Sequence, residues 1–258
     1  MKRREFLAAG ALAGMVPVGQ TAQAQQKQQT QIIEWRHYSA PFGDGRKRLL
    51  DFLKDAAVPA WNRLGITPVG VFNVTFGPNQ SSVHVLLPHA NMDSVLLTES
   101  RLLDDAVFLR AAESFMALPS KDPGYWRIES SLLKCFSHMP RIEPPDTGKS
   151  RLFEVRIYES HNEVKGKKKI QMFNEGGEIE IFRKSGLTPV LFAETIVGPR
   201  RPNLIYMLTF ADMAAREKSW GVFRTHPDWL ALKDKPEYAD TVCNINDHIL
   251  SPAPFSQI

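Results

Sequence analysis

The sequence has little cysteine and little excess charge. Only two of its 258 residues are cysteine, Cys135 and Cys243, which is too few for a disulfide framework or a cysteine-ligated zinc site. Lys and Arg together number 32 and Asp and Glu number 28, so the formal net charge is only +4 and a nucleic-acid partner is not expected. With 43% hydrophobic and 23% charged residues, the composition excludes collagen and wholesale disorder.

The familiar short catalytic motifs are also missing. There is no Gly-rich phosphate loop, no nucleophile-elbow serine, no His-Glu-x-x-His and no Cys-x-x-Cys. His84 and His89 are five residues apart with Pro88 between them, which is not a convincing metal-ligand spacing. A metal site assembled across strands is the alternative, but we expect no metal and no resident cofactor. The basic run at 165–169 has acidic neighbours and no interleaved aromatics, which is typical of a solvated loop and helix start.

The first 24 residues have the pattern of a signal peptide. A positive start at residues 2–4 precedes an apolar stretch at 8–18 and a small-residue Ala-Gln-Ala ending. The apolar stretch is too short to span a bilayer, which takes about 20 residues. Residues 3–7 (RREFL) resemble the twin-arginine export signal, with an ordinary signal or a retained anchor as the alternative. We expect a periplasmic or secreted protein with a flexible leader at 25–31.

An internal duplication organises the rest of the chain. The pentapeptide Glu34-Trp35-Arg36-His37-Tyr38 recurs 120 residues later as Glu154-Val155-Arg156-Ile157-Tyr158. Further on, Gly-Ile-Thr-Pro-Val at 65–69 recurs as Gly-Leu-Thr-Pro-Val at 186–190, and both halves then carry a Gly-Pro pair. We expect two similar repeats, at 32–139 and 151–258, joined by a proline-rich linker at 140–150.

Each repeat has the predicted order β-α-β-β-α-β. The first contains a strand through 34–38, a helix through 49–61, strands at 69–76 and 83–87, a helix at 102–118 and a strand at 130–136. The second contains a strand through 154–158, a helix through 170–182 broken at Gly176-Gly177, strands at 190–197 and 204–210, a helix at 214–232 and a strand at 242–250. This is the α+β, ferredoxin-like arrangement. Helices cover only one face of such a sheet, so we expect the two tandem repeats to pack their sheets together as an intrachain pseudo-dimeric α/β barrel.

In the oxidising compartment expected for an exported protein, Cys135 and Cys243 can pair. Both lie in apolar, strand-like segments near the ends of the two repeats. We therefore expect two buried free thiols, with a disulfide as the alternative.

These motifs together resemble the NIPSNAP family. The resemblance rests on the duplicated Glu-x-Arg-x-Tyr strand, the Gly-x-Thr-Pro-Val and Gly-Pro segments, the sequence SSLL at 130–133 and His-Pro-Asp-Trp at 226–229. It extends over nearly the whole chain after the signal. The family belongs to the dimeric α/β-barrel group, which also holds the antibiotic-biosynthesis monooxygenases. The resemblance implies the fold, but a fold does not determine a function.

The Glu-x-Arg-x-Tyr motif supplies the first candidate site residues. Because side chains alternate along a strand, Glu, Arg and Tyr share one face, which we expect to point to the other repeat or into a cavity. In a functional interpretation Arg36 and Arg156 anchor an anion or carbonyl, and Tyr38 and Tyr158 donate hydrogen bonds. In a structural interpretation, favoured by retention in both copies, the motif orients the interface between the repeats. The predicted interface residues are Glu34, Arg36, Glu154 and Arg156.

Differences between the repeats supply further candidates. His84 aligns with Ile205, and Tyr206 aligns with Val85. We expect His84 and His226 as candidate general bases, and Tyr206 and Trp229 as candidate ligand contacts. The alternative is that the aromatic stripe containing Trp229 packs in the core and that His226-Pro227 begins a helix.

The expected function is to bind a small, partly apolar molecule. Analogy with the monooxygenase relatives implies cofactor-free oxygenation or isomerisation, and the alternative is a non-catalytic binding or assembly module. A cavity lined by a histidine and an arginine favours the enzyme. Tightly packed sheets with every Glu-x-Arg-x-Tyr side chain paired favour the module. We expect no membrane span after signal removal, and a homo-oligomer is a further possibility.

Overall fold

A computed structural model describes residues 30–41, 43–77 and 80–258. The predicted signal peptide, and the predicted leader up to residue 29, lie outside these residues. The first half contains β1 (Ile32–Ser39), α1 (Asp44–Phe52), the π-helical segment η1 (Leu53–Ala57), α2 (Val58–Arg63), β2 (Gly70–Phe76), β3 (Val83–His89), α3 (Met92–Leu103), α4 (Ala106–Met116) and β4 (Arg127–Cys135). The second contains β5 (Leu152–Glu159), α5 (Glu163–Phe173), α6 (Glu178–Lys184), β6 (Thr188–Val197), β7 (Asn203–Phe210), α7 (Met213–Thr225), α8 (Pro227–Lys233), the 3-10 helix η2 (Pro236–Tyr238) and β8 (Asn244–Pro252).

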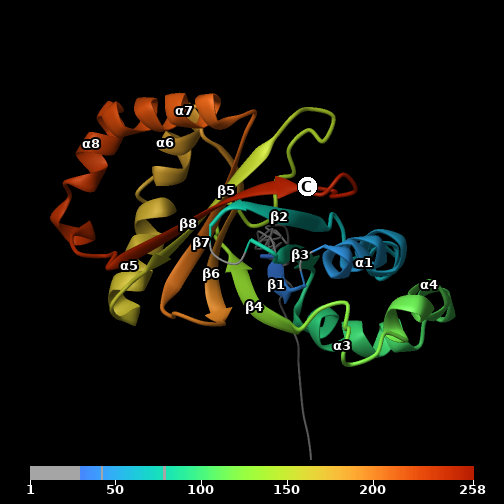
Figure 1. Cartoon of the computed structure of the whole chain (residues 1–258). Coiled ribbons are helices and arrows are strands. Elements are labelled where there is room, and N and C mark those ends of the chain that lie inside the picture. The colour runs from blue at the N-terminus through green and yellow to red at the C-terminus, as the bar shows by residue number, and fades with distance from the viewer. Residues whose placement is uncertain (1–29, 42, 78–79) are drawn as a thin grey trace, which may run out of the picture.

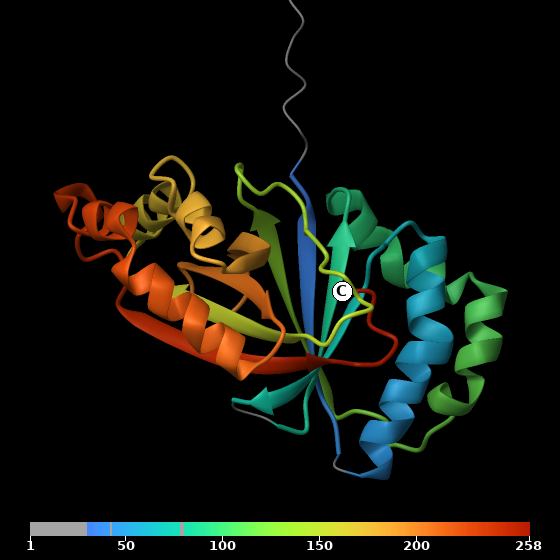
Figure 2. The same ribbon diagram turned by 90° about the horizontal axis from the view of Figure 1, so that it is seen from above.

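The eight strands form one closed antiparallel barrel, which confirms the expected α+β class. The strand order is β1-β3-β2-β8-β5-β7-β6-β4. Within each half the last, first, third and second strands are neighbours in that order, which is the ferredoxin-like arrangement. The halves join where β2 pairs with β8 and where β4 pairs with β6. Helices α1–α4 lie on one outer side of the barrel and α5–α8 on the other (Figures 1 and 2).

The expected helix ends and turns are mostly present. Gly65 and Gly186 follow the first helical region of each half with φ of 78° and 76°, values that glycine adopts without steric conflict. A break at Gly177, with φ of 84°, separates α5 from α6 as predicted. Helices α3, α4, α5 and α7 each begin at a residue whose side chain accepts backbone N–H groups. These caps are Asn91, Asp105, Asn162 and Asp212.

Two of the predicted helices are divided in the structure. The helix expected at 102–118 is the end of α3 followed by α4, because Asp105 caps a new helix. The helix expected at 214–232 is α7 followed by α8, because Pro227 has no amide hydrogen to continue α7 and occupies the first turn of α8.

The hydrophobic core has three parts. One lies between the first sheet and its helices and includes Leu49 and Trp61. A second fills much of the barrel interior, around Phe72 and Phe153. The third lies between the second sheet and its helices and includes Phe182. Both faces of each sheet are therefore buried, one against helices and one against the opposite sheet.

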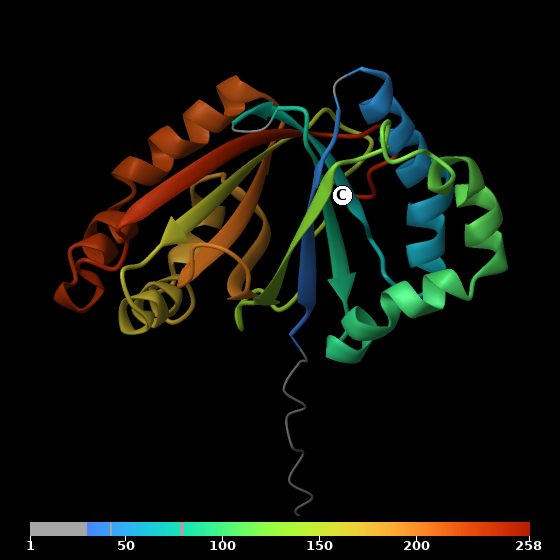
Figure 3. The same cartoon turned by 60° about the horizontal axis from the view of Figure 1, so that its bottom comes forward.

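The last six residues pack on the first half of the chain. After β8 the backbone turns back along β2, where the Ala253 amide donates to the Val71 oxygen at 2.8 Å and the Gln257 amide donates to the Val69 oxygen at 2.9 Å. Ile258 is fully buried in the barrel core. The end of the second repeat thus fastens the two halves together (Figure 3).

The two thiols are free, but only one matches the expectation of burial. Cys135 is buried, and burial raises the pKa of its thiol to about 12. Cys243 is exposed and lies immediately before β8. No helix in the described part of the chain is long and apolar enough to cross a membrane.

Candidate functional site

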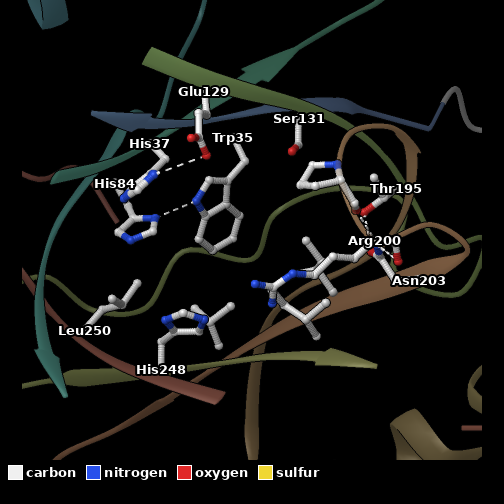
Figure 4. Close-up of a pocket in the computed structure, with 14 residues that line it drawn as sticks. Trp35, His37, His84, Glu129, Ser131, Thr195, Arg200, Asn203, His248 and Leu250 are labelled. Carbon is white, nitrogen blue, oxygen red and sulfur yellow. Dashed lines mark hydrogen bonds and ion pairs between the residues drawn. The ribbon is translucent and has the colours of Figure 1, made fainter. Parts of the chain in front are cut away.

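A cavity of about 270 Å³ lies inside the barrel and receives side chains from both halves. Its apolar lining consists of Val155, Ile157, Ile205, Leu250 and Pro199. Its polar lining consists of Trp35, His37, His84, Glu129, Ser131, Thr195, Arg200, Asn203 and His248 (Figure 4). An apolar wall combined with convergent polar groups is the usual form of a small-molecule site.

Strand register brings the polar residues together. His37 on β1 lies opposite His84 on β3, and the two rings stack with centroids 4.8 Å apart. His248 on β8 lies opposite Val155, and its ring centroid is 6.3 Å from that of His84. Three histidines that are far apart in sequence therefore share one side of the cavity.

The predicted orientation of the first strands is wrong. Trp35, His37, Val155 and Ile157 line the cavity, whereas the Glu-x-Arg-x-Tyr side chains face the helices. The apolar pair Val155 and Ile157 was expected to face the helix-covered core. The barrel interior is equally apolar, so alternation separates two faces without telling which one points inward.

In the first half, the Glu-x-Arg-x-Tyr motif binds its own helices. Arg36 donates to Glu34 through Nε at 2.8 Å and Nη2 at 3.0 Å, and its Nη2 also donates to Glu99 on α3 at 2.9 Å. The Arg36 guanidinium lies 5.6 Å from the Trp61 ring centroid. Tyr38 is buried in the same helix-side cluster.

The second half repeats this arrangement with different partners. Glu154 is completely buried and accepts hydrogen bonds from Arg156 Nε at 2.9 Å, Arg216 Nη2 at 2.6 Å and Trp220 Nε1 at 2.6 Å. The guanidinium of Arg156 lies 4.4 Å from the Trp220 ring centroid.

The predicted interface role of Glu34, Arg36, Glu154 and Arg156 is therefore corrected. Their ion pairs connect each sheet with its own helices instead of joining the two halves. A buried guanidinium needs acceptors, and each half supplies them locally.

The predicted ligand contacts also lie on the helix side of the sheets. Tyr206 donates to the Tyr158 hydroxyl at 2.9 Å, and burial raises the pKa of Tyr206 well above its ordinary value. Trp229 packs on Phe223 with ring centroids 4.6 Å apart. Together with Arg36, Tyr38, Arg156 and Tyr158, these residues do not line the barrel cavity.

His226 begins a helix, as the alternative interpretation predicted. Its Nδ1 accepts the Asp228 amide at 3.2 Å at the start of α8. It does not line the cavity that contains His84, so the structure does not bring the two candidate bases together.

His84 lies in the cavity, but its chemistry differs from the prediction. Trp35 Nε1 donates to His84 Nδ1 at 2.9 Å, so the neutral ring carries its proton on Nε2. Burial, aided by His37 and His248, lowers the pKa of His84 to about 3. Near neutral pH His84 is therefore a hydrogen-bond donor through Nε2 and a poor general base.

His37 has the better geometry for a base. Its Nδ1 lies 3.7 Å from Glu129 Oε2 at the exposed rim of the cavity. A carboxylate beside one ring nitrogen orients the imidazole and favours a proton on that nitrogen, which leaves the other nitrogen available. Neither His37 nor Glu129 was among the candidate site residues predicted from the sequence.

The region around His248 is tightly built. Burial is the main cause that lowers its pKa, and its Nδ1 is buried without a hydrogen-bond partner among the described residues. A Cβ atom at Gly77 would lie only 3.0 Å from that nitrogen, and the φ of Gly77 is 142°. Glycine is therefore required for this close approach of the β2–β3 turn.

Arg200 approaches from the β6–β7 turn. Its side chain extends toward the middle of the cavity (Figure 4), and its backbone has φ of 59°. Asn203 Nδ2 donates to the Pro199 and Arg200 oxygens at 3.0 and 2.8 Å, and Thr195 Oγ1 donates to Asn203 Oδ1 at 2.6 Å. This network holds the turn at the cavity.

Sequence reasoning therefore missed Arg200, His248, Glu129 and Trp35 as parts of one site. A signal was available for Trp35 and His37, because both differ from the aliphatic residues at the equivalent positions of the second half. Arg200 and His248 carried no comparable signal. Within the described ranges, no group of three or more His, Cys, Asp or Glu side chains is placed to hold a metal ion.

The closed antiparallel barrel with helices on its outside is also the fold of two solved structures described as monooxygenases. A monooxygenase-like protein from Lactobacillus acidophilus superposes with a TM-score of 0.56 at 10% identity, over 86% of this chain and 94% of that one. A second from Fusobacterium nucleatum superposes with a TM-score of 0.50 at 8% identity, over 86% and 92%. At these identities the likeness concerns the fold alone.

The second half also matches a family model. Residues 153–257 match the model of the NIPSNAP family. A NIPSNAP-like domain protein from Burkholderia xenovorans is 22% identical over 41% of this chain and 88% of its own, with a TM-score of 0.38. No curated protein matches the sequence at a significant level.

Proposed function

We propose that this protein binds a small, partly apolar molecule in the barrel cavity and transfers a proton to or from it. The observation that carries the proposal is the cavity itself. A space of about 270 Å³ has an apolar wall and receives three imidazoles and a guanidinium. This size suits a ligand smaller than the drug-sized molecules that fill pockets of about 300–1,000 Å³.

The polar groups divide into complementary roles. His37, oriented by Glu129, accepts a proton from an acidic C–H or O–H group of the ligand. His84 donates through Nε2, and the Arg200 guanidinium supplies positive charge, so both stabilise negative charge that develops on a ligand oxygen. Arg200 replaces Arg36 and Arg156 in this role, because neither of those lines the cavity.

These groups are sufficient for an isomerisation, in which the proton removed from one atom returns to another. A monooxygenase-like reaction needs dioxygen as a second substrate and oxidant. The fold of the monooxygenase-like neighbours favours including that reaction in the test.

A non-catalytic binding module is the second candidate function. It is favoured by the helix-side networks, in which the Glu-x-Arg pairs are consumed by structural contacts in both halves. The expectation for a module is met only in part, because the Glu-x-Arg pairs are satisfied on the helix side while the two sheets enclose an open cavity.

Native mass spectrometry of the purified protein tests the binding proposal. We expect an added mass that is lost on denaturation. The identified ligand is then incubated with protein in deuterium oxide and followed by NMR. Proton transfer is supported if a ligand hydrogen exchanges for deuterium with the wild type and this exchange is lost with His37→Ala. The control is His161→Ala, which changes a histidine outside the cavity. A ligand that binds without exchange or oxygenation assigns the protein to the binding module.

We also propose export by the twin-arginine route, followed by function in the periplasm or outside the cell. The proposal rests on the order of charged, apolar and small residues in the first 24 positions. We expect wild-type protein in the periplasmic fraction or the medium. The Arg3→Lys/Arg4→Lys variant accumulates in the cytoplasm if the pair is recognised. Unchanged export of this variant contradicts the route.

A further inference from the structure

We propose that the ligand of the cavity carries one anionic oxygen head group, a carboxylate or a phenolate, on an apolar body, and that Arg200 recognises this head group. The proposal rests on the proposed function and adds the chemical class of the ligand.

The charge of the cavity favours an anion. Its lining contributes the Arg200 guanidinium and the His84 Nε2–H group as donors. Among the described lining residues Glu129 is the only carboxylate, and it lies at the exposed rim beside His37. A cation placed in the cavity would meet the positive charge of Arg200, whose neighbouring carboxylate Glu159 is 3.9 Å away and is not part of the cavity lining, whereas an anion completes the set of donors.

Arg200 is available to bind a ligand, in contrast to the two arginines of the repeated motif. Arg36 and Arg156 each donate to a buried carboxylate within 3 Å. The nearest carboxylate oxygen to Arg200 is Glu159 Oε1, which is 3.9 Å from Nη1 and already accepts from Asn246 at 2.7 Å. Among the described residues, the guanidinium of Arg200 donates no hydrogen bond.

The backbone at Arg200 supports a recognition role. Its φ of 59° lies in the left-handed region, which disfavours residues with a Cβ atom by about 1–2 kcal/mol. Glycine would fill this position at lower energy. The buried Asn203 holds the two carbonyl groups of the turn, so the root of the Arg200 side chain is fixed at the cavity. The side chain beyond this root is 56% exposed and is free to turn toward a ligand.

The remaining lining defines the body of the ligand. Val155, Ile157, Ile205 and Leu250 present aliphatic carbon to the cavity. Such a wall gains free energy from apolar contact and offers no polar partner. A ligand with one charged end and an otherwise apolar body satisfies both parts of the cavity.

Three probes with the same fused-ring body separate the head group from the body. These are 2-naphthoate, 2-naphthylmethanol and 2-naphthylmethylammonium, and binding is measured by titration calorimetry with the full protein. We expect 2-naphthoate to bind at least about tenfold more tightly than the other two, as charge-assisted hydrogen bonds allow. A fourth probe, 2-naphthol, distinguishes the sources of the anion. Its binding with release of a proton to the buffer identifies a phenolate site, whereas preferred binding of naphthoate without proton transfer identifies a carboxylate site.

Arg200→Gln and Arg201→Gln form a matched pair of variants, because they change adjacent arginines of one turn and only Arg200 lines the cavity. We expect Arg200→Gln to weaken naphthoate binding by about tenfold to a hundredfold while leaving naphthylmethanol unchanged. Arg201→Gln is expected to change neither. An equal effect of Arg200→Gln on both probes overturns the role of Arg200. Tighter binding of naphthylmethanol than of naphthoate overturns the anionic class and leaves the proposed function standing. Absence of binding by all probes overturns both.

Discussion

Glu34 provides a quantitative test of the helix-side network. Its side chain is nearly buried and accepts hydrogen bonds from Arg36 Nε at 2.8 Å, Arg36 Nη2 at 3.0 Å and Ser130 Oγ at 2.5 Å. Burial alone raises the pKa of this carboxyl. The neighbouring His89, Arg36 and Ser130 outweigh burial and lower the pKa from 4.5 to about 2.

The free energy of unfolding follows from this difference. A folded-state pKa about 2.5 units below the unfolded value corresponds to about 3 kcal/mol, at about 1.4 kcal/mol per unit. Because the folded-state pKa is the lower one, this stabilisation is fully present above about pH 4.5. It is lost as the pH falls toward about 2. Glu34→Gln removes the charge, so it is expected to destabilise the protein by about 3 kcal/mol at pH 7.

Urea unfolding followed by tryptophan fluorescence, at several pH values between 7 and 3, measures the effect. The difference between wild type and Glu34→Gln should shrink by about 1.4 kcal/mol for each pH unit below about 4.5. Glu99→Gln is the control, because Glu99 contacts the same guanidinium at 2.9 Å from a side chain that is 70% exposed. We expect it to change stability by less than about 1 kcal/mol. A Glu34→Gln difference that is independent of pH, or a loss no larger than that of the control, refutes the reasoning.

Three further perturbations test other parts of the structure. Lys169→Met leaves Glu178 buried without its 2.7 Å partner and is expected to lower the free energy of unfolding by about 3–5 kcal/mol. The double variant Lys169→Met/Glu178→Met should recover most of this loss in the same urea assay. No recovery in the double variant would contradict the ion-pair explanation. Trp35→Phe removes the donor to His84 Nδ1. Nitrogen chemical shifts at pH 7 should therefore show a single Nε2–H tautomer of His84 in the wild type and a mixture of tautomers in the variant. An unchanged tautomer in the variant would argue against that hydrogen bond. Gly198→Ala places a Cβ atom 2.7 Å from Ser131 Oγ at a φ of 152° and is expected to lower the melting temperature; Gly221→Ala, which meets nothing within 4 Å inside α7, should leave it unchanged or raise it.

Most of the fold follows from local signals combined with the duplication. Gly65 and Gly186 mark helix ends, and the repeated Gly-Pro pairs mark the two hairpins. The order of elements then restricts each half to a ferredoxin-like sheet with one uncovered face. Two such faces in one chain close the barrel without a second copy of the protein. The division at Asp105 was also present in the sequence, since Asp is a favoured helix cap.

The candidate site was less predictable because a barrel buries both faces of its sheets. Periodicity distinguished Glu34, Arg36 and Tyr38 from Trp35 and His37, but not the inward from the outward face. The Glu-x-Arg-x-Tyr motif was interpreted as a candidate ligand site. In the structure its charged side chains instead satisfy one another and their partners between each sheet and its helices. Arg200 belongs to a turn whose position relative to β1 depends on closure of the whole barrel, so no local pattern indicates it.

The duplication also explains how one cavity acquires chemically different walls. His37 and His84 are paired across β1 and β3, and the equivalent pair across β5 and β7 is Ile157 and Ile205. Two identical chains related by a twofold axis would place the same residues at both pairs of positions. A single chain with two copies is free of that restriction, because each copy varies independently. His37 and His84 of the first copy then share a space with Ile157 and Ile205 of the second, to which His248 and Arg200 of the second copy add further polar groups. Because equivalent positions of the two copies carry different side chains, any site in the barrel is a single one and not one of two symmetric sites.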